Sequence, residues 1–125
     1  MIAIDASSFR RFLDGEWTAE KDVVLVRAAL HSRDAFLPPI AVAELLSERD
    51  LDDESRATIV ELPLLPIQPG YWARTGELRA SLLRLGRKAM LADCLIAQSC
   101  IDNDAPLITY DRDFRHFENA GLKLL

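Results

Sequence analysis

Short apolar segments alternate with helical patterns along this chain, and that alternation limits the kind of sheet that it can form. Strands are expected over residues 1–4, 35–37 and 106–109, with an edge strand over 62–67 and a last strand over 122–125. Helices are expected from about residue 9, over 23–30, 40–49 and 91–101, after Asp52 and after Gly70, with a short helical turn over 111–117. Because parallel strands need crossover connections, which are usually helical, this order predicts an α/β fold, a three-layer α/β/α sandwich with a mostly parallel central sheet.

Residues typical of helix ends mark several of these boundaries. Ser7 and Ser8 are candidate N-caps for the first helix, and Gly15 with Trp17 and Thr18 predicts a break after it. The helix after Gly70 has apolar residues available for a buried stripe, namely Trp72, Leu78, Leu82, Leu83 and Leu85. The pair Tyr71 and Trp72 is interpreted as core packing or an oligomer contact rather than as a base-stacking platform.

Length and composition fit a single domain over residues 1–125. Half of the residues are hydrophobic, which suffices for one continuous core. The net charge of -5 argues against a general nucleic-acid-binding surface, but it does not exclude a nucleic-acid enzyme in which a bound metal inverts the charge locally. Because the chain shows neither a signal-like N-terminal segment nor an apolar run of about 20 residues, we expect a cytoplasmic protein without a membrane partner.

The cysteines and histidines offer no nucleophile and no zinc site. Cys94 and Cys100 have no further Cys or His at zinc-ligand spacing, so both are interpreted as reduced core thiols. His31 and His116 lie far apart in sequence, and no nucleophile signature accompanies them. A Ser-His-Asp or Cys-His mechanism therefore has no support.

Four carboxylates stand at the ends of apolar segments or within them, where apolar or neutral residues are usual. These residues are Asp5, Glu44, Asp93 and Asp111. In an open α/β sheet, ligands bind outside the carboxyl ends of the strands, and Asp5 and Asp111 should lie there. Like charges that lie close together raise one another's pKa unless a cation lies between them. The set therefore predicts a divalent-metal site.

Two of these residues have structural roles as alternatives to metal binding. Asp5 is a competent N-cap for the helix that follows, although Ser7 and Ser8 compete for that position. Ser7 is instead placed to hydrogen-bond the Asp5 carboxylate or a metal-bound water. Glu44 is the only polar residue between Pro39 and Ser47, and it faces either outward into solvent or inward among apolar neighbours.

The remaining acidic positions leave similar alternatives open. Asp93 lies in an apolar helix, where burial of an unpaired carboxylate is costly, yet a place in the first helical turn would stabilise it. Asp111 and Asp113 both follow a strand, where a capping aspartate is expected. Asp111 is favoured as the ligand because it lies nearer the strand end.

Basic residues near these acids are candidates for contact with a phosphate backbone. They are Arg84, Arg87, Lys88 and Arg112. A basic cluster of this kind usually belongs to a solvated helix end, but beside an acidic pocket it would hold a phosphate backbone.

Taken in order, these segments resemble the PIN-domain family, and more narrowly the VapC-type toxins of bacterial and archaeal toxin-antitoxin pairs. The similar segments are residues 2–7, 42–45, 91–97 and 106–114, which carry Asp5, Glu44, Asp93 and the pair Asp111 and Asp113. Each segment alone is a weak signal, whereas the ordered set is specific and spans almost the whole chain.

The resemblance implies a dimeric, metal-dependent ribonuclease that a small antitoxin protein holds inactive. It implies catalytic roles for Asp5, Glu44, Asp93 and Asp111, and support from Ser7 and Thr109. It implies binding of Mg²⁺ or Mn²⁺ by Asp5, Asp93 and the pair Asp111 and Asp113, and it leaves open which of that pair is the direct ligand. Carboxylates suit these hard cations. Such an ion can deprotonate a water for in-line attack on a phosphodiester, so no protein nucleophile is required.

Two other functions compete with this interpretation. A phosphatase of the haloacid dehalogenase type needs a second aspartate two residues after its nucleophile, and here that position is Ser7. The second rival is a catalytically silent binding module whose acidic pocket accepts basic side chains from a partner. Melting in the presence of metal discriminates this module from the metal-dependent enzyme, because a module that binds no metal gains no stability from it.

Overall fold

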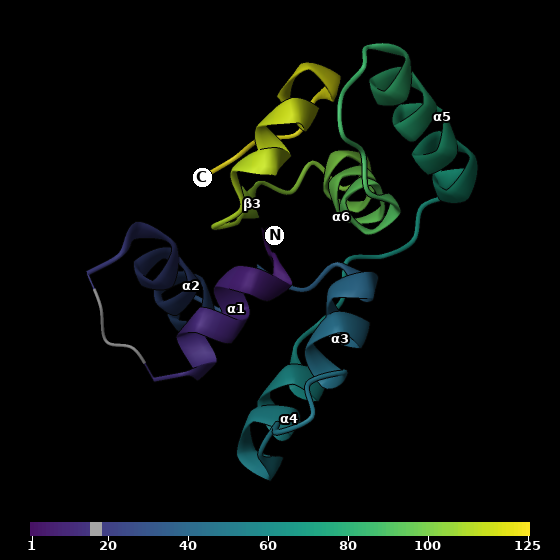
Figure 1. Ribbon diagram of the computed structural model, residues 1–125. Coiled ribbons are helices and arrows are strands. Elements are labelled where there is room, and N and C mark those ends of the chain that lie inside the picture. Colours follow the sequence, from purple (N-terminus) through teal and green to yellow (C-terminus); the bar gives the residue numbers. More distant parts are fainter. Residues whose placement is uncertain (16–18) are drawn as a thin grey trace.

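Three short parallel strands form the centre of the protein, and helices cover both faces of the sheet (Figure 1). The computed structural model describes residues 1–15 and 19–125. The strands β1 (Ile2–Ile4), β2 (Ala35–Phe36) and β3 (Leu107–Ile108) lie in the order β2-β1-β3. Both pairings are parallel, so the carboxyl ends of all three strands meet at one edge. The predicted parallel sheet covered by helices is confirmed.

The helices agree with the prediction in position and differ mainly at their ends. They are α1 (Ala6–Leu13), α2 (Lys21–His31), α3 (Pro39–Leu46), α4 (Asp53–Glu61), α5 (Tyr71–Arg84), α6 (Leu91–Asp102) and the 3₁₀ helix η1 (Arg112–Ala120). Pro39 occupies the first turn of α3, as expected, but that helix ends at Leu46 rather than near residue 49. The Asp52 side chain caps α4 by accepting a bond of 2.7 Å from the Ser55 backbone N–H.

The start of α1 differs from the prediction. Asp5, not Ser7 or Ser8, precedes the first helical residue. Both serine hydroxyls have other partners, because Ser7 donates to Asp5 and Ser8 donates to Asp22. Of the predicted break, Gly15 lies in the turn after α1 with a positive φ of 74°, a conformation that glycine tolerates well. Trp17 and Thr18 lie outside the described residues.

The strands predicted over residues 62–67 and 122–125 are not formed, and each segment makes one parallel bridge at an edge of the sheet instead. Leu64 pairs with Leu37 beside β2, and Leu124 pairs with Leu107 beside β3. Prolines at 63 and 66 flank the first bridge and have no N–H to donate, which prevents a longer ladder. The second bridge is short because β3 itself has only two residues.

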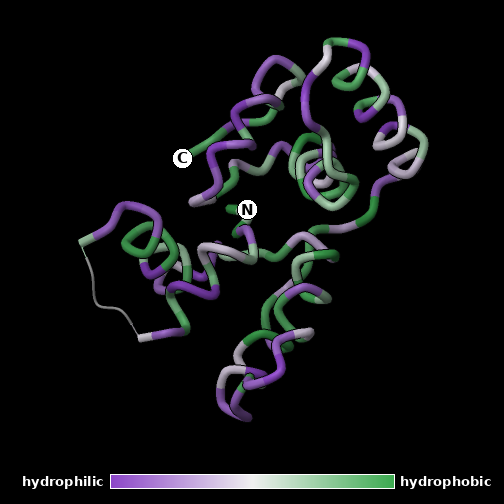
Figure 2. Tube along the Cα trace, in the orientation of Figure 1, coloured by the Kyte–Doolittle hydropathy of each residue, from purple (hydrophilic) through white to green (hydrophobic). Residues whose placement is uncertain are grey.

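Alternate strand residues face two separate apolar cores. Ala3 and Leu107 belong to the core beneath α5, α6 and η1, whereas Ile4 and Ile108 belong to the core beneath α1 to α4. This division follows from the two-residue period of a strand. Figure 2 shows hydrophobic and hydrophilic residues alternating along the helices, as expected where one side of a helix is buried and the other is exposed.

The predicted apolar stripe of α5 is only partly buried. Leu78 and Leu82 lie in the core, whereas Trp72 is 69% exposed and Leu83 and Leu85 are also exposed. Tyr71 takes the buried position instead, with its hydroxyl donating to the Leu95 carbonyl at 2.6 Å. The assignment of Trp72 to the buried stripe was therefore wrong.

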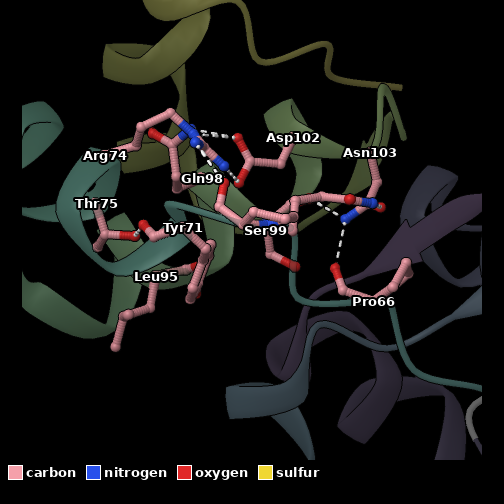
Figure 3. A network of polar contacts seen from close by, with 11 residues as sticks. Pro66, Tyr71, Arg74, Thr75, Leu95, Gln98, Ser99, Asp102 and Asn103 are labelled. Atoms are coloured by element: carbon pink, nitrogen blue, oxygen red, sulfur yellow. Dashed lines mark hydrogen bonds and ion pairs between the residues drawn. The ribbon is translucent and has the colours of Figure 1, made fainter.

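A polar network joins α5 to the end of α6 (Figure 3). The Arg74 guanidinium donates to both carboxylate oxygens of Asp102, at 2.9 and 2.6 Å, and Gln98 donates to the same carboxylate at 2.8 Å. Asn103 bonds to the Ser99 and Pro66 carbonyls, which fastens the edge segment to α6. The network therefore stabilises the helix that carries Asp93.

Both cysteines are buried free thiols, as predicted. Burial raises the pKa of Cys100 to about 12, so this thiol is inert near neutral pH. Among the described helices, none has both the length and the apolar character needed to cross a membrane.

Candidate active site

Asp5 lies at the carboxyl end of β1 with its side chain turned into the protein. The residue is only 6% exposed, and its Oδ2 atom accepts bonds from the Ser7 hydroxyl at 2.7 Å and the Thr109 hydroxyl at 2.9 Å. Its side chain makes no capping bond to α1, so the capping role does not explain it. Burial raises the pKa of Asp5 even though these hydroxyl bonds oppose the shift.

Thr109 connects Asp5 to the acidic turn that follows β3. Its hydroxyl oxygen donates to Asp5 and also accepts a bond of 3.0 Å from the Asp111 backbone N–H. Asp111 in turn caps η1, since its Oδ1 atom accepts from the Asp113 backbone N–H at 2.9 Å. The expected capping aspartate is thus Asp111, the residue for which the sequence favoured a ligand role. One of its carboxylate oxygens carries the cap.

Asp93 lies in the first turn of α6 and is affected electrostatically by the other acids. Its pKa is raised to about 6, first by burial and then by the negative charges of Asp111, Asp5 and Asp113, while Lys88 opposes the shift. The dipole of α6 favours a carboxylate at this position. The two interpretations of Asp93 are therefore compatible, because the residue lies in the first helical turn and also belongs to the acidic pocket.

Glu44 approaches the same acids from α3. Its side chain is exposed, in line with the outward-facing alternative, and its pKa is raised by partial burial and then by the charges of Asp5 and Asp93. The outward face of α3 is therefore the face that borders the acidic pocket. The structure thus places every acidic residue that the sequence singled out within electrostatic reach of Asp93.

The donor set suits a hard divalent cation, although the side chains as they stand do not enclose one. Carboxylate oxygens are preferred ligands of Mg²⁺ and Mn²⁺. These acids repel one another, and a bound cation would reduce that repulsion. Within residues 1–15 and 19–125, no group of three or more His, Cys, Asp or Glu side chains converges on one point. Binding would require the carboxylates to turn toward a common centre.

The basic residues predicted to contact RNA are all exposed, and two of them contact η1. The Lys88 ammonium lies 3.9 Å from an Asp113 oxygen, and Arg87 lies 2.9 Å from the His116 ring nitrogen. Arg84 is exposed at the end of α5, and Arg112 is exposed at the start of η1. Of this set, Lys88 is the residue whose charge acts on Asp93.

The sequence of residues 2–120 matches the family model described as the PIN domain. The chain belongs to the PIN-domain family. The resemblance that the sequence suggested is confirmed, and the match includes all the acidic residues of the pocket.

This PIN domain is also similar in fold to the crystal structure of VapBC2 from Rickettsia felis bound to a DNA fragment from their promoter. The TM-score is 0.64 and the two sequences are 20% identical, with 100% of this chain and 98% of that chain covered. A comparison with curated protein sequences gave no match.

A cleft of about 460 Å³ opens beside the acidic pocket of the PIN domain and shares Thr109 and Asp111 with it. Tyr110 also lines this cleft, and sequence reasoning did not single it out. Its position in the sequence could have indicated it, because Tyr110 follows a strand and lies between two predicted site residues, Thr109 and Asp111. Arg115, also on the cleft wall, lies within the predicted turn, and the sequence offers no signal that its side chain borders the site.

Proposed function

We propose that this PIN domain is a metal-dependent endoribonuclease and the toxin of a toxin-antitoxin pair. The observation that carries the proposal is the acidic pocket, in which burial and then the charges of Asp111, Asp5 and Asp113 raise the pKa of Asp93 to about 6. Perturbed carboxylates that gather at strand ends are typical of functional sites. The membership of the PIN-domain family supports the nuclease assignment.

Asp5, Asp93, Asp111 and Asp113 would hold Mg²⁺ or Mn²⁺. When bound, such a cation supplies a Lewis acid and an activated water for attack on a phosphodiester. Ser7 and Thr109 orient the Asp5 carboxylate through their hydroxyl bonds. Glu44, exposed on α3 and affected by the charges of Asp5 and Asp93, would accept a proton from the attacking water.

The basic side chains complete the proposed substrate path. Lys88 borders the acids, and Arg84, Arg87 and Arg112 extend a positive rim on which a phosphate backbone would lie. The net charge of the chain is -5, so recognition of RNA would depend on this local rim. Reversing these charges should weaken RNA binding and leave metal affinity unchanged.

An antitoxin and a second copy of the chain belong to the same proposal, as does action in the cytoplasm, where the RNA substrate is found. The occurrence of a similar fold in VapBC2 supports the antitoxin. The homodimer rests on the resemblance to VapC-type toxins, and light scattering of the purified chain tests it.

Cleavage of total cellular RNA, mapped by end sequencing, tests the enzymatic activity. Wild type in Mn²⁺ should create new RNA ends that are absent in chelator and absent with Asp5→Asn or Asp93→Asn. Asp53→Asn is a matched control, because it removes one charge from the exposed first turn of α4. Ends that persist with Asp93→Asn at the wild-type rate would remove Asp93 from the site.

A catalytically silent binding module is the second candidate, and one observation favours it. The described acidic side chains do not converge on one point. Melting with and without Mn²⁺ separates the two functions, since an enzyme that binds the ion should gain stability and a silent module should not.

A further inference from the structure

We propose that the cleft beside the acidic pocket binds one base of the RNA, stacked on the ring of Tyr110. The proposal rests on the ribonuclease function proposed above and adds a residue that would determine where the substrate is cut. Tyr110 connects the two parts of the site, because its neighbours Thr109 and Asp111 belong to the pocket and all three line the cleft. A base held here would place the adjoining phosphate next to the carboxylates.

The Tyr110 ring is available to a ligand and is held in place by the protein. The residue is 59% exposed, and the Arg11 guanidinium carbon lies 4.0 Å from the ring centre. Arg11 is fixed by a bond of 2.9 Å to Asp22 and by an ion pair with Glu20. A cation over one face of the ring steadies it and leaves the opposite face for a base.

Asp22 anchors this arrangement from inside the protein. It is only 8% exposed, and it accepts a bond of 2.9 Å from the buried Ser8 hydroxyl as well as the bond from Arg11. The ring therefore rests on a side chain that is itself tied to the core. Less side-chain freedom is lost on binding when the platform is fixed beforehand.

The walls of the cleft combine apolar and cationic groups in the way that a nucleotide requires. Leu25, Ile108 and Leu124 supply apolar surface, and Arg112 and Arg115 lie on the same cleft. Within the described part of the chain, no ion pair is found for either arginine, so both are available to phosphate. The volume of about 460 Å³ is within the range of small-ligand sites.

The choice of RNA over a basic peptide as the occupant rests on the exposed ring and the two arginines and not on net charge, because Asp111 and Glu118 also line the cleft. Glu20 and Asp22 are the acids that would attract a basic side chain at the α2 end of the cleft, and Arg11 already pairs with both. The exposed aromatic ring and the two arginines are instead suited to a base and its phosphates.

A double-mutant cycle between Tyr110 and the RNA tests the site. Short single-stranded RNA oligonucleotides spanning a mapped cleavage site are bound to protein carrying Asp93→Asn, with each base replaced in turn by an abasic residue. Tyr110→Ala should weaken binding of the intact RNA by about five- to 150-fold, the range that stacking of one base supplies. One abasic position should weaken binding similarly and cause no further loss when combined with Tyr110→Ala. Tyr110→Phe keeps the ring and should bind like the parent.

Trp72→Ala is the matched control, because Trp72 is an exposed aromatic residue on α5 that does not line the cleft. It should leave binding unchanged. The base site is wrong if the loss of binding from Tyr110→Ala simply adds to the loss from every abasic position. If wild type still cleaves RNA in Mn²⁺ in that case, the ribonuclease proposal stands and the cleft is left to a protein partner. If wild type makes no metal-dependent cuts, the ribonuclease proposal fails and the base site fails with it.

Discussion

The Thr109 hydroxyl donates to Asp5 at 2.9 Å and accepts from the Asp111 backbone at 3.0 Å, so one side chain fixes the relative positions of the two strand ends. Asp5 follows β1 and Asp111 follows the end of β3. The hydrogen-bond partners that orient a metal-binding carboxylate commonly affect affinity almost as strongly as the ligand itself.

Replacing Thr109 should therefore damage the site without unfolding the protein. Thr109→Val keeps the shape of the side chain but removes both hydroxyl bonds, and we expect Mn²⁺ affinity or cleavage to fall by about 10- to 100-fold. Calorimetric titration with Mn²⁺ measures the affinity. Thr109→Ser retains the hydroxyl and should stay close to wild type. Wild-type Mn²⁺ affinity in Thr109→Val would show that the hydroxyl does not position Asp5.

Neutralising Asp93 should have opposite effects on stability and on metal response. In chelator, Asp93→Asn removes a partly buried charge that its acidic neighbours repel, so the melting temperature should rise by a few degrees. In Mn²⁺, the upward shift of the melting temperature should shrink, because a ligand is lost. Scanning calorimetry in both buffers measures the two effects. A variant that melts lower than wild type in chelator would contradict the proposed repulsion.

The raised pKa of Asp93 also predicts how stability depends on pH in the absence of metal. The folded protein holds this proton up to a pH of about 6, whereas the unfolded chain releases it near 3.8. Between these values the folded state binds more protons, so the contribution of Asp93 to stability falls as pH rises toward 6 and is constant above it. Urea unfolding across this range, compared with Asp93→Asn, measures the contribution. A difference between the two proteins that does not change with pH would rule out the shift.

The Arg74 and Asp102 pair should contribute more to stability than a surface ion pair. Asp102→Ala removes the acceptor of both Arg74 and Gln98, and Gln98 is only 6% exposed, so its amide would lose a bond that water cannot readily replace. We expect a loss of about 1–3 kcal/mol in the free energy of unfolding, measured in urea. Lys123→Ala is the control, since its pair with Asp104 is exposed on both sides. Equal effects of the two substitutions would contradict this ranking.

The order of strands and helices could be predicted because it depends on local patterns. The period of the apolar residues placed α2, α3 and α6 well, and the acids at the segment ends marked the pocket before any contact was known. Local patterns could not show that Tyr71 rather than Trp72 is buried, because the choice depends on how α5 rotates against α6. They also could not show that Ser7 and Ser8 bond to aspartates from two different elements.

The cleft was harder to anticipate because its parts are distant in sequence. Arg11, Asp22 and Tyr110 come from three elements or their ends, and the contact of Arg11 with the Tyr110 ring exists only after folding. The edge strands were overestimated for a similar reason. Residues 62–67 and 122–125 are apolar enough for strands, but the pairing available to each is one bridge.

The bond between Asp5 and Thr109 spans 104 positions of the chain, so Asp5 gains this partner only after most of the chain has been synthesised. While a ribosome is still making this protein, Asp5 and Ser7 leave the tunnel long before Thr109 does. The pocket can be completed only when the end of the chain emerges and β3 takes its place beside β1. Any activity that depends on the oriented Asp5 carboxylate therefore belongs to a chain in which β3 has already paired with β1.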